Sequence, residues 1–281
     1  MPCSGWSTTA SGTTATTCAP EQPVTRGQLA TFLYRYSGKP AVALDPSSPR
    51  CEATGGASDE FDSGAVDLRG GGSGAWTLEN GHLAELAGID LSIAGKLLIV
   101  PTQSFHNGWF RTANGVYVHR PIEGDLAAIR IRVVSADSPG AGATPGPGYS
   151  GGLLVRDAAD GDDWVMYNMG DQAPGFGYGR ELKTTLDASS VLELHPQVET
   201  THRLLVCRVG SEFHHFHRSA AGTEWTEEVR SHDRPDIGAA VDAGIVANAW
   251  QGGPRPWIEV DAIHFGIPTS LADCNSSVAP V

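Results

Sequence analysis

The stretch LAAIRIRVV, residues 126–134, decides how this chain is expected to fold. Ile129 and Ile131 alternate with Arg130 and Arg132, so an extended chain here has one apolar side and one charged side. Alternation with a period of two is typical of an antiparallel strand that has one face on a hydrophobic core. The stretch therefore predicts a half-buried β-strand.

Seven further stretches carry short apolar patterns bounded by Gly, Pro, Asp or Asn. They are GGLLVRD (151–157), DWVMYNMG (163–170), SSVLELH (189–195), HRLLVCRVG (202–210), EFHHFHR (212–218), DAGIVANAW (242–250) and WIEVDAIHFG (257–266). No helical period separates them, and many short strands without intervening helices predict a two-sheet sandwich. The expected fold class is all-β, a two-sheet antiparallel sandwich with a short N-terminal helical segment; the resemblance described below implies that the sandwich is a jelly roll.

The helical segment is PVTRGQLATFLYRYSG, residues 23–38. Leu29, Phe32, Leu33 and Tyr36 form one apolar stripe at helical spacing. We divide the chain into four parts on this basis. They are the helical segment within 1–38, a Pro/Ser/Gly-rich linker at 39–58, the β domain at 59–268 and a tail at 269–281.

Composition limits the partners that the chain is expected to have. It has 281 residues with 35 Gly and 18 Pro, and a formal net charge of −13 argues against nucleic acid and anionic membranes. No apolar run approaches the roughly 20 residues of a membrane span, so no membrane insertion is expected. No signal peptide is visible, and an exported protein would need a signal that this sequence does not show.

The five cysteines allow at most two disulfides. Cys51 and Cys274 bracket the β region, so they can meet if the first and last strands are neighbours. Cys207 lies in an apolar strand pattern and is expected to be a buried free thiol. Cys3 and Cys18 are undecided, and the alternative is that all five thiols are free.

The N-terminal segment TTATTCAPEQPVTRGQLATFLYRYSG (13–38) resembles the C-terminal half of an S-layer homology repeat. The matching features are a Pro-x-x-x-Val-Thr-Arg turn and a helix with Leu29, Phe32 and Leu33. Cys18 stands where the family usually has Phe, and the first helix of the repeat is absent. The resemblance implies a fragment of a cell-wall anchor, whereas the alternative is a surface helix that packs on the sandwich.

The β region resembles concanavalin A-like lectin/glucanase jelly rolls, particularly bacterial glycosidase-accessory domains such as the C-terminal domains of β-xylosidases. The segments that carry the resemblance are VYVHRPIEGDLAAIRIRV, SGGLLVRDAADGDDWVMY, RLLVCRVGSEFHHFHRSAAGTEW and DAGIVANAW. It implies a carbohydrate-related role, but one fold hosts many sites.

Aromatic rings match the apolar faces of sugars, and planar polar groups pair with sugar hydroxyls. The residues chosen on this basis as candidate ligand-binding residues are Trp109, Tyr117, Arg156, Asp163, Tyr167 and Trp250. Trp164 is expected in the core instead.

Two further sites are considered and not favoured. EVDAIH (259–264) is similar to the Glu-x-Asp-x-x-Glu signature of jelly-roll glucanases, but His264 replaces the second Glu. No catalytic residue is therefore assigned. His215 and His217 share a strand face and can ligate one metal if a third ligand comes from elsewhere. The alternative is that both are ordinary half-buried strand residues.

Jelly rolls of this type often hold a structural calcium where the first and last strands meet. The resemblance implies Asp59 and Asp261 as its ligands, with backbone carbonyls or water completing the shell. The alternative is that Asp59 belongs to a solvated turn and Asp261 accepts backbone hydrogen bonds.

These observations lead to an expected function. The chain is interpreted as a secreted or cell-wall-associated carbohydrate-binding accessory module, located outside the cell or at its surface, with a polysaccharide or a cell-wall polymer as partner. One alternative is a glycoside hydrolase or polysaccharide lyase of the same fold, and another is a structural or adhesive spacer. A binding role is favoured over an enzymatic one.

Overall fold

The computed structural model describes ten parts of the chain. They are residues 59, 61, 76–90, 97–102, 108–123, 127–136, 148–173, 176–196, 199–250 and 257–274. All of them belong to one compact unit, Pro49–Val281. The expected helix, the linker and Cys51 lie outside the described residues, so the four-part division of the chain remains a prediction.

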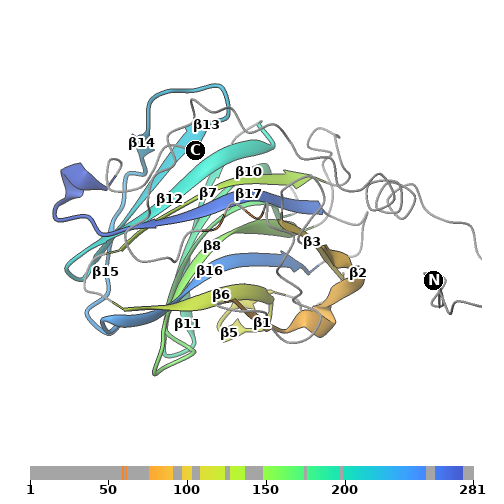
Figure 1. Ribbon diagram of the computed structural model, residues 1–281, viewed down its shortest axis with the longest axis horizontal. Coiled ribbons are helices and arrows are strands. Elements are labelled where there is room, and N and C mark those ends of the chain that lie inside the picture. The colour runs from red at the N-terminus through yellow and green to blue at the C-terminus, as the bar shows by residue number, and fades with distance from the viewer. Residues whose placement is uncertain are drawn as a thin grey trace, which may run out of the picture. The chain divides into compact units, whose positions relative to one another are not determined.

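Within these residues, antiparallel strands form two large sheets (Figure 1). In spatial order, the seven-stranded sheet contains β1 (Thr77–Glu79), β6 (Val116–Glu123), β16 (Ala240–Ala249), β8 (Tyr149–Asp157), β9 (Trp164–Ala173), β10 (Gly177–Leu186) and β11 (Ser189–Pro196). The eight-stranded sheet contains β14 (Thr226–Glu227), β13 (Glu212–Ser219), β12 (Thr201–Val209), β7 (Ala127–Ala136), β17 (Trp257–Gly266), β3 (Leu97–Pro101) and β2 (Ala84–Asp90), with β15 (His232–Asp233) beside β13.

The smaller elements are a hairpin and two single turns of 3-10 helix among the described residues. They are β4 (Trp109–Phe110) with β5 (Thr112–Ala113), η2 (Gly81–Leu83) and η3 (Leu271–Asp273). All eight stretches read as strands from the sequence are strands, so the predicted all-β sandwich is confirmed. No helix among the described residues is long and apolar enough to span a membrane.

The main hydrophobic core draws side chains from both sheets. Leu153 and Val165 contribute from the seven-stranded sheet, and Leu204 and Ile258 contribute from the eight-stranded sheet; all four are buried. The sheets approach closely at Gly151, where an added Cβ would lie 2.3 Å from a methyl carbon of Ile258. Each fully buried aliphatic side chain of this kind contributes about 1.5–3 kcal/mol to folding.

Both sheets also bury apolar side chains on their outer faces. The outer cluster of the seven-stranded sheet consists of Trp109, Tyr117, Leu154, Trp164, Met166 and Val246. The outer cluster of the eight-stranded sheet consists of Leu205, Cys207, Phe216 and Cys274. These second clusters explain why GGLLVRD and HRLLVCRVG are apolar at consecutive positions instead of alternating.

The predicted cysteine chemistry is wrong for two residues. Cys207 is not a free thiol, because it forms a disulfide with Cys274, with a Cα–Cα distance of 5.8 Å. Cys274 is therefore not available to Cys51. The physical reason is strand order: β17 and β12 lie on either side of β7, so the chain that leaves β17 reaches the outer face of β12 after crossing one strand.

Candidate functional site

Four neighbouring strands place polar side chains on the outer face of the seven-stranded sheet. Tyr117 and His119 are two residues apart on β6, so they share one face. Glu79 on β1 lies opposite Tyr117, and Asp242 on β16 lies opposite Arg156 on β8. Because the strand order is β1-β6-β16-β8, these residues come together although they are far apart in sequence.

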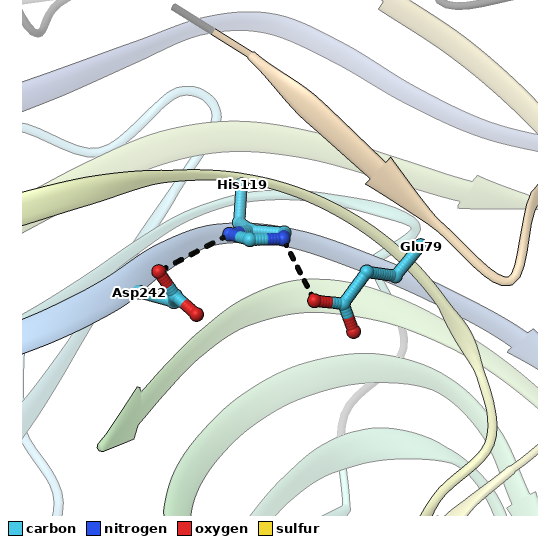
Figure 2. A group of neighbouring side chains, drawn as sticks. All are labelled: Glu79, His119 and Asp242. Carbon is cyan, nitrogen blue, oxygen red and sulfur yellow. Dashed lines mark ion pairs between the residues drawn. The ribbon is translucent and has the colours of Figure 1, made fainter. Parts of the chain in front are cut away.

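Arg156 holds the two carboxylates in place. Its guanidinium donates to Glu79 Oε2 at 2.9 Å and to Glu79 Oε1 at 2.6 Å. The nitrogen that reaches Oε1 also donates to Asp242 Oδ2 at 2.8 Å. The imidazole of His119 lies between the same two carboxylates, with Nε2 3.0 Å from Glu79 Oε1 and Nδ1 3.5 Å from Asp242 Oδ1 (Figure 2).

Tyr117 supports this group from the sheet. Its ring is stacked against the His119 ring, with centroids 4.5 Å apart and planes inclined by 16°. Its hydroxyl donates to the carbonyl oxygen of Asp242 at 2.8 Å, with the Leu154 carbonyl oxygen 3.1 Å away. Trp109 from the β4–β5 hairpin packs edge-on against Tyr117 at 5.5 Å. The rings of Tyr117 and Trp109 are buried, so they fix the geometry of the group.

Hydrogen bonds within the group keep Glu79 and Arg156 charged. The hydrogen bonds from His119 and then Arg156 lower the pKa of Glu79 from 4.5 to about 2. Burial opposes the charge of Arg156, but the hydrogen bonds to Glu79 and Asp242 outweigh burial and raise the pKa of Arg156. The side chains of Glu79 and Asp242 are 34% and 19% exposed, against 10% for Arg156 and 6% for His119. A ligand would therefore meet carboxylate oxygens first, as hydrogen-bond acceptors.

Replacing Arg156 by methionine is expected to lower the free energy of unfolding by about 2–3 kcal/mol. The change leaves two carboxylates close together without their cation, at partly buried positions. Urea denaturation at neutral pH measures the effect. The matched control is Arg230→Met, which removes the exposed ion pair with Glu193 and should cost less than about 1 kcal/mol. Equal losses in the two variants would contradict the central role of Arg156.

The structure brings Tyr117 and Arg156 together, with Trp109 beside them, but it separates the other predicted binding residues. Tyr167 points into the core side, where its hydroxyl donates to Glu228 at 2.6 Å. Trp250 is half-buried, and its backbone N–H donates to the Gly148 carbonyl at 2.9 Å. Whether any of these residues binds a ligand remains a prediction.

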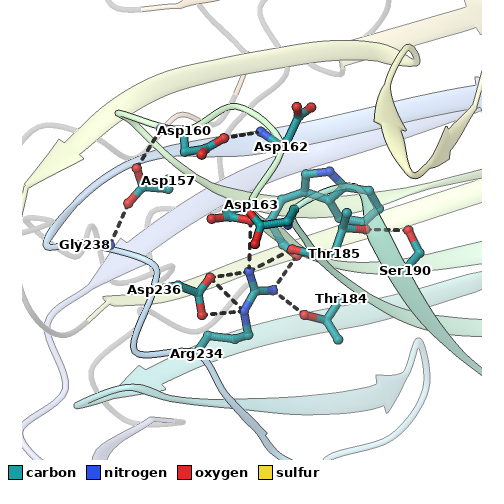
Figure 3. A network of polar contacts seen from close by, with 12 residues as sticks. Asp157, Asp160, Asp162, Asp163, Thr184, Thr185, Ser190, Arg234, Asp236 and Gly238 are labelled. Atoms are coloured by element: carbon teal, nitrogen blue, oxygen red, sulfur yellow. Dashed lines mark hydrogen bonds and ion pairs between the residues drawn. The ribbon is translucent and has the colours of Figure 1, made fainter.

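Asp163 belongs to a polar network at the β8–β9 turn (Figure 3). Its carboxylate accepts from the backbone N–H of Asp187 at 2.9 Å and lies 3.9 Å from the Arg234 guanidinium. Burial raises the pKa of Asp163. Arg234 also donates to the carbonyl oxygens of Trp164 at 3.0 Å and Thr185 at 2.7 Å. The network ties the turn to β10 and to the chain before β16.

The two histidines considered for metal binding have different neighbours. His215 is fully buried, with its ring 5.4 Å from Tyr167 and 5.3 Å from His232. His217 lies beside His202, with ring centroids 5.6 Å apart. Burial lowers the pKa of His215 well below its ordinary value. His215 is therefore a core residue and not a half-buried one.

Asp59 does lie beside the last strand, since it forms a two-way backbone bridge with Ile263 of β17 at 2.9 Å. Its carboxylate accepts from the Phe61 N–H at 2.8 Å and from the Trp76 indole N–H at 2.7 Å. The described residues contain two three-residue clusters of potential metal ligands, Glu79–His119–Asp242 and Asp160–Asp163–Asp187. Neither cluster includes Asp59 or Asp261, and the calcium site remains a prediction.

Sequence reasoning missed Glu79, His119 and Asp242. His119 lies in the stretch VYVHRPIEG, and Asp242 lies in DAGIVANAW. Each residue interrupts the apolar character of one strand face. That break was the available signal. The pairing of β6 with β16, which brings His119 and Asp242 together, is visible only in the structure.

No family model and no curated protein matches this sequence. Solved structures do share its fold. The xylan β-1,4-xylosidase of Bacillus halodurans matches with a TM-score of 0.54 and 12% identity over 74% of this chain and 38% of its own. A Bacteroides ovatus GH43B protein of a xyloglucan locus matches with a TM-score of 0.53 and 15% identity, over 75% of this chain and 39% of its own.

A protein of unknown function from Saccharomyces cerevisiae matches with a TM-score of 0.50 and 15% identity, over 70% of this chain and 98% of its own. The match thus spans about two fifths of each of these two bacterial proteins, but nearly all of the yeast protein. At these identities the matches show the β-sandwich fold. The same fold therefore occurs as part of glycoside hydrolases and as nearly a whole chain.

Proposed function

We propose that this chain is a carbohydrate-active protein and that the group around Arg156 holds a glycan. The observation that carries the proposal is the pair of partly exposed carboxylates, Glu79 and Asp242, fixed by one buried guanidinium. Sugar hydroxyls donate hydrogen bonds to such acceptors, and bonds to charged groups are the stronger ones. Because the carboxylates are already oriented, binding does not have to order them.

The charge of the group limits the class of glycan that it can bind. Glu79 and Asp242 share a single fixed cation, Arg156, and the whole chain carries a net charge of −13. A polymer of uronic acids would meet like charges, so a neutral glycan is the better partner. Two of the solved proteins that share this fold are named for xylan and xyloglucan, which makes these two polymers the first to test.

Replacing Glu79 by glutamine and Asp242 by asparagine should weaken glycan binding at least about tenfold, because each change replaces a charged acceptor by a neutral one. Affinity electrophoresis in gels that contain xylan, xyloglucan or polygalacturonate measures the effect. The control is Glu227→Gln, an equivalent change on β14 of the other sheet. Retardation by polygalacturonate alone, or equal retardation of all variants, would contradict the proposal.

Hydrolysis is a second candidate function of the same group. One carboxylate oxygen of Glu79 and one of Asp242 lie within 4.8 Å of each other, close to the roughly 5–5.5 Å between the carboxyl groups of retaining glycosidases. The names of the bacterial structures also favour it. With a pKa of about 2, Glu79 is no proton donor at neutral pH, so in such a reaction Glu79 would be the nucleophile and the acid would have to be Asp242. Reducing-end release from xylan that disappears in Asp242→Asn would establish it.

A cell-surface location and a cell-wall polymer as partner are further proposals, supported by the S-layer-like segment at 13–38. A fusion of residues 1–58 to an unrelated soluble protein, tested for sedimentation with purified cell walls, examines this part separately from the β domain.

A further inference from the structure

A groove of about 470 Å³ opens on the eight-stranded sheet, where β12, β13, the turn after β13 and β14 meet. It lies on a different sheet from the group around Arg156. Its volume falls within the usual range of small-molecule sites. Among its lining residues His202 is buried and His217 is half-buried, and Arg218, Glu199 and Glu224 supply its charged groups.

The two imidazoles are uncharged at neutral pH. Burial, and after it the nearby Arg180 guanidinium, lower the pKa of His217 from 6.5 to about 4 and also lower the pKa of His202. A neutral imidazole offers one hydrogen-bond donor and one acceptor. Both kinds of group are therefore present in the most buried part of the groove.

His202 has an unmet hydrogen-bonding capacity. Its Nδ1 atom is buried and makes no hydrogen bond of ordinary geometry; Glu199 Oε2 lies 3.5 Å away. A buried polar atom of this kind requires an explanation, such as an ordered water or a ligand group. A ligand hydroxyl that enters the groove can satisfy it.

The charges of the groove disfavour anions. Glu199 and Glu224 supply two carboxylates against one guanidinium, Arg218, which also lies over the Trp225 ring at 4.9 Å. The hydroxyls of Ser219, Thr223 and Thr226 add groups that can both donate and accept hydrogen bonds. Such a lining suits a ligand that both donates and accepts hydrogen bonds without carrying charge.

We infer that this groove binds an uncharged, hydroxyl-rich ligand, a single saccharide unit, at a second site separate from the group around Arg156. The inference does not depend on the proposed function, because the two sites share no residue. It assigns His202 and His217 as hydrogen-bonding residues at the closed end of the groove, with Glu199 as an acceptor at its rim.

The test uses the full chain and ligand-observed NMR with xylose, arabinose, glucose, xylotetraose and glucuronate. We expect at least one neutral saccharide to bind more tightly than glucuronate. Thr223→Trp places a bulky ring at the exposed rim. In a Glu79→Gln background, which impairs the group around Arg156, it should weaken the remaining binding at least about tenfold by exclusion. Val229→Trp adds the same ring at a side chain that is 99% exposed, outside the groove, and should change nothing.

Each outcome decides the matter. Absence of binding by all neutral saccharides, binding in a Glu79→Gln background that Thr223→Trp does not weaken, or tighter binding of glucuronate would overturn the inference. Binding lost in Glu79→Gln but kept in Thr223→Trp would support the proposed function and reject the groove. The opposite result would support the groove and reject the group around Arg156 as the glycan site.

Discussion

Replacing Cys274 by alanine lowers the free energy of unfolding by about 4 kcal/mol, measured by urea denaturation under oxidising conditions. The disulfide joins residues separated by 67 positions, and a closed loop of this length restricts the unfolded chain strongly in the chain-entropy model. Cys207→Ala should cause a similar loss. The double variant should lose no more than about 1 kcal/mol beyond either single one, because both changes break the same bond.

Cys51→Ala is the control. The sequence alone suggested that Cys51 pairs with Cys274, whereas in the structure Cys274 is bonded to Cys207. If Cys51→Ala loses stability and Cys207→Ala does not, the disulfide in solution is Cys51–Cys274. Reducing agent should destabilise the wild type by the same amount as Cys274→Ala, and it should leave that variant nearly unchanged.

Acidification from pH 6.5 to pH 4 is expected to destabilise the protein by at least about 2 kcal/mol. His217 has a pKa of about 4 in the folded protein and 6.5 as its ordinary value, which the unfolded chain should show. Between these values the unfolded state binds more protons, so stability falls as pH falls. This pKa difference corresponds to about 3 kcal/mol over the whole titration, and most of it is lost between pH 6.5 and pH 4.

Other imidazoles act in the same direction. Burial also lowers the pKa of His202, His215 and His232, so each adds to the loss of stability below pH 6.5. Denaturation curves measured across this pH range give the slope. His217→Gln should reduce the slope, because it removes one of the groups whose protonation differs between the two states. A wild-type slope of zero, or an unchanged slope in His217→Gln, would contradict this account.

The strands could be predicted from sequence because each carries its own pattern. In LAAIRIRVV the alternation is local, so neither its partners nor its position in the sheet need to be known. The disulfide could not be predicted, because Cys207 looks the same in sequence whether it faces the main core or the outer face. The consecutive apolar residues of HRLLVCRVG did indicate that both faces are covered.

The candidate site was harder to predict for a related reason. Aromatic residues were chosen as ligand platforms, but Trp109 and Tyr117 are buried in an outer apolar cluster. Their sequence pattern does not show whether an aromatic ring on the outer face is buried or exposed. The polar residues that gather beside them depend on the order β1-β6-β16-β8, which is not the order of the sequence. Of the polar residues that hold the carboxylates, only Arg156 was chosen from the sequence, and Tyr117 was chosen as a ligand platform but packs beneath the group.

The strand order also bears on how the chain is made. β16 fills the place between β6 and β8, and β17 fills the place between β7 and β3, although they are the two C-terminal long strands that the structure describes. During synthesis on the ribosome, each sheet therefore lacks a central strand until residues 240–266 have emerged. Until then the flanking strands expose unpaired edges, which are prone to aggregate. The nascent chain consequently needs shielding by chaperones or a slow, late collapse, as sandwiches dominated by long-range pairing generally do.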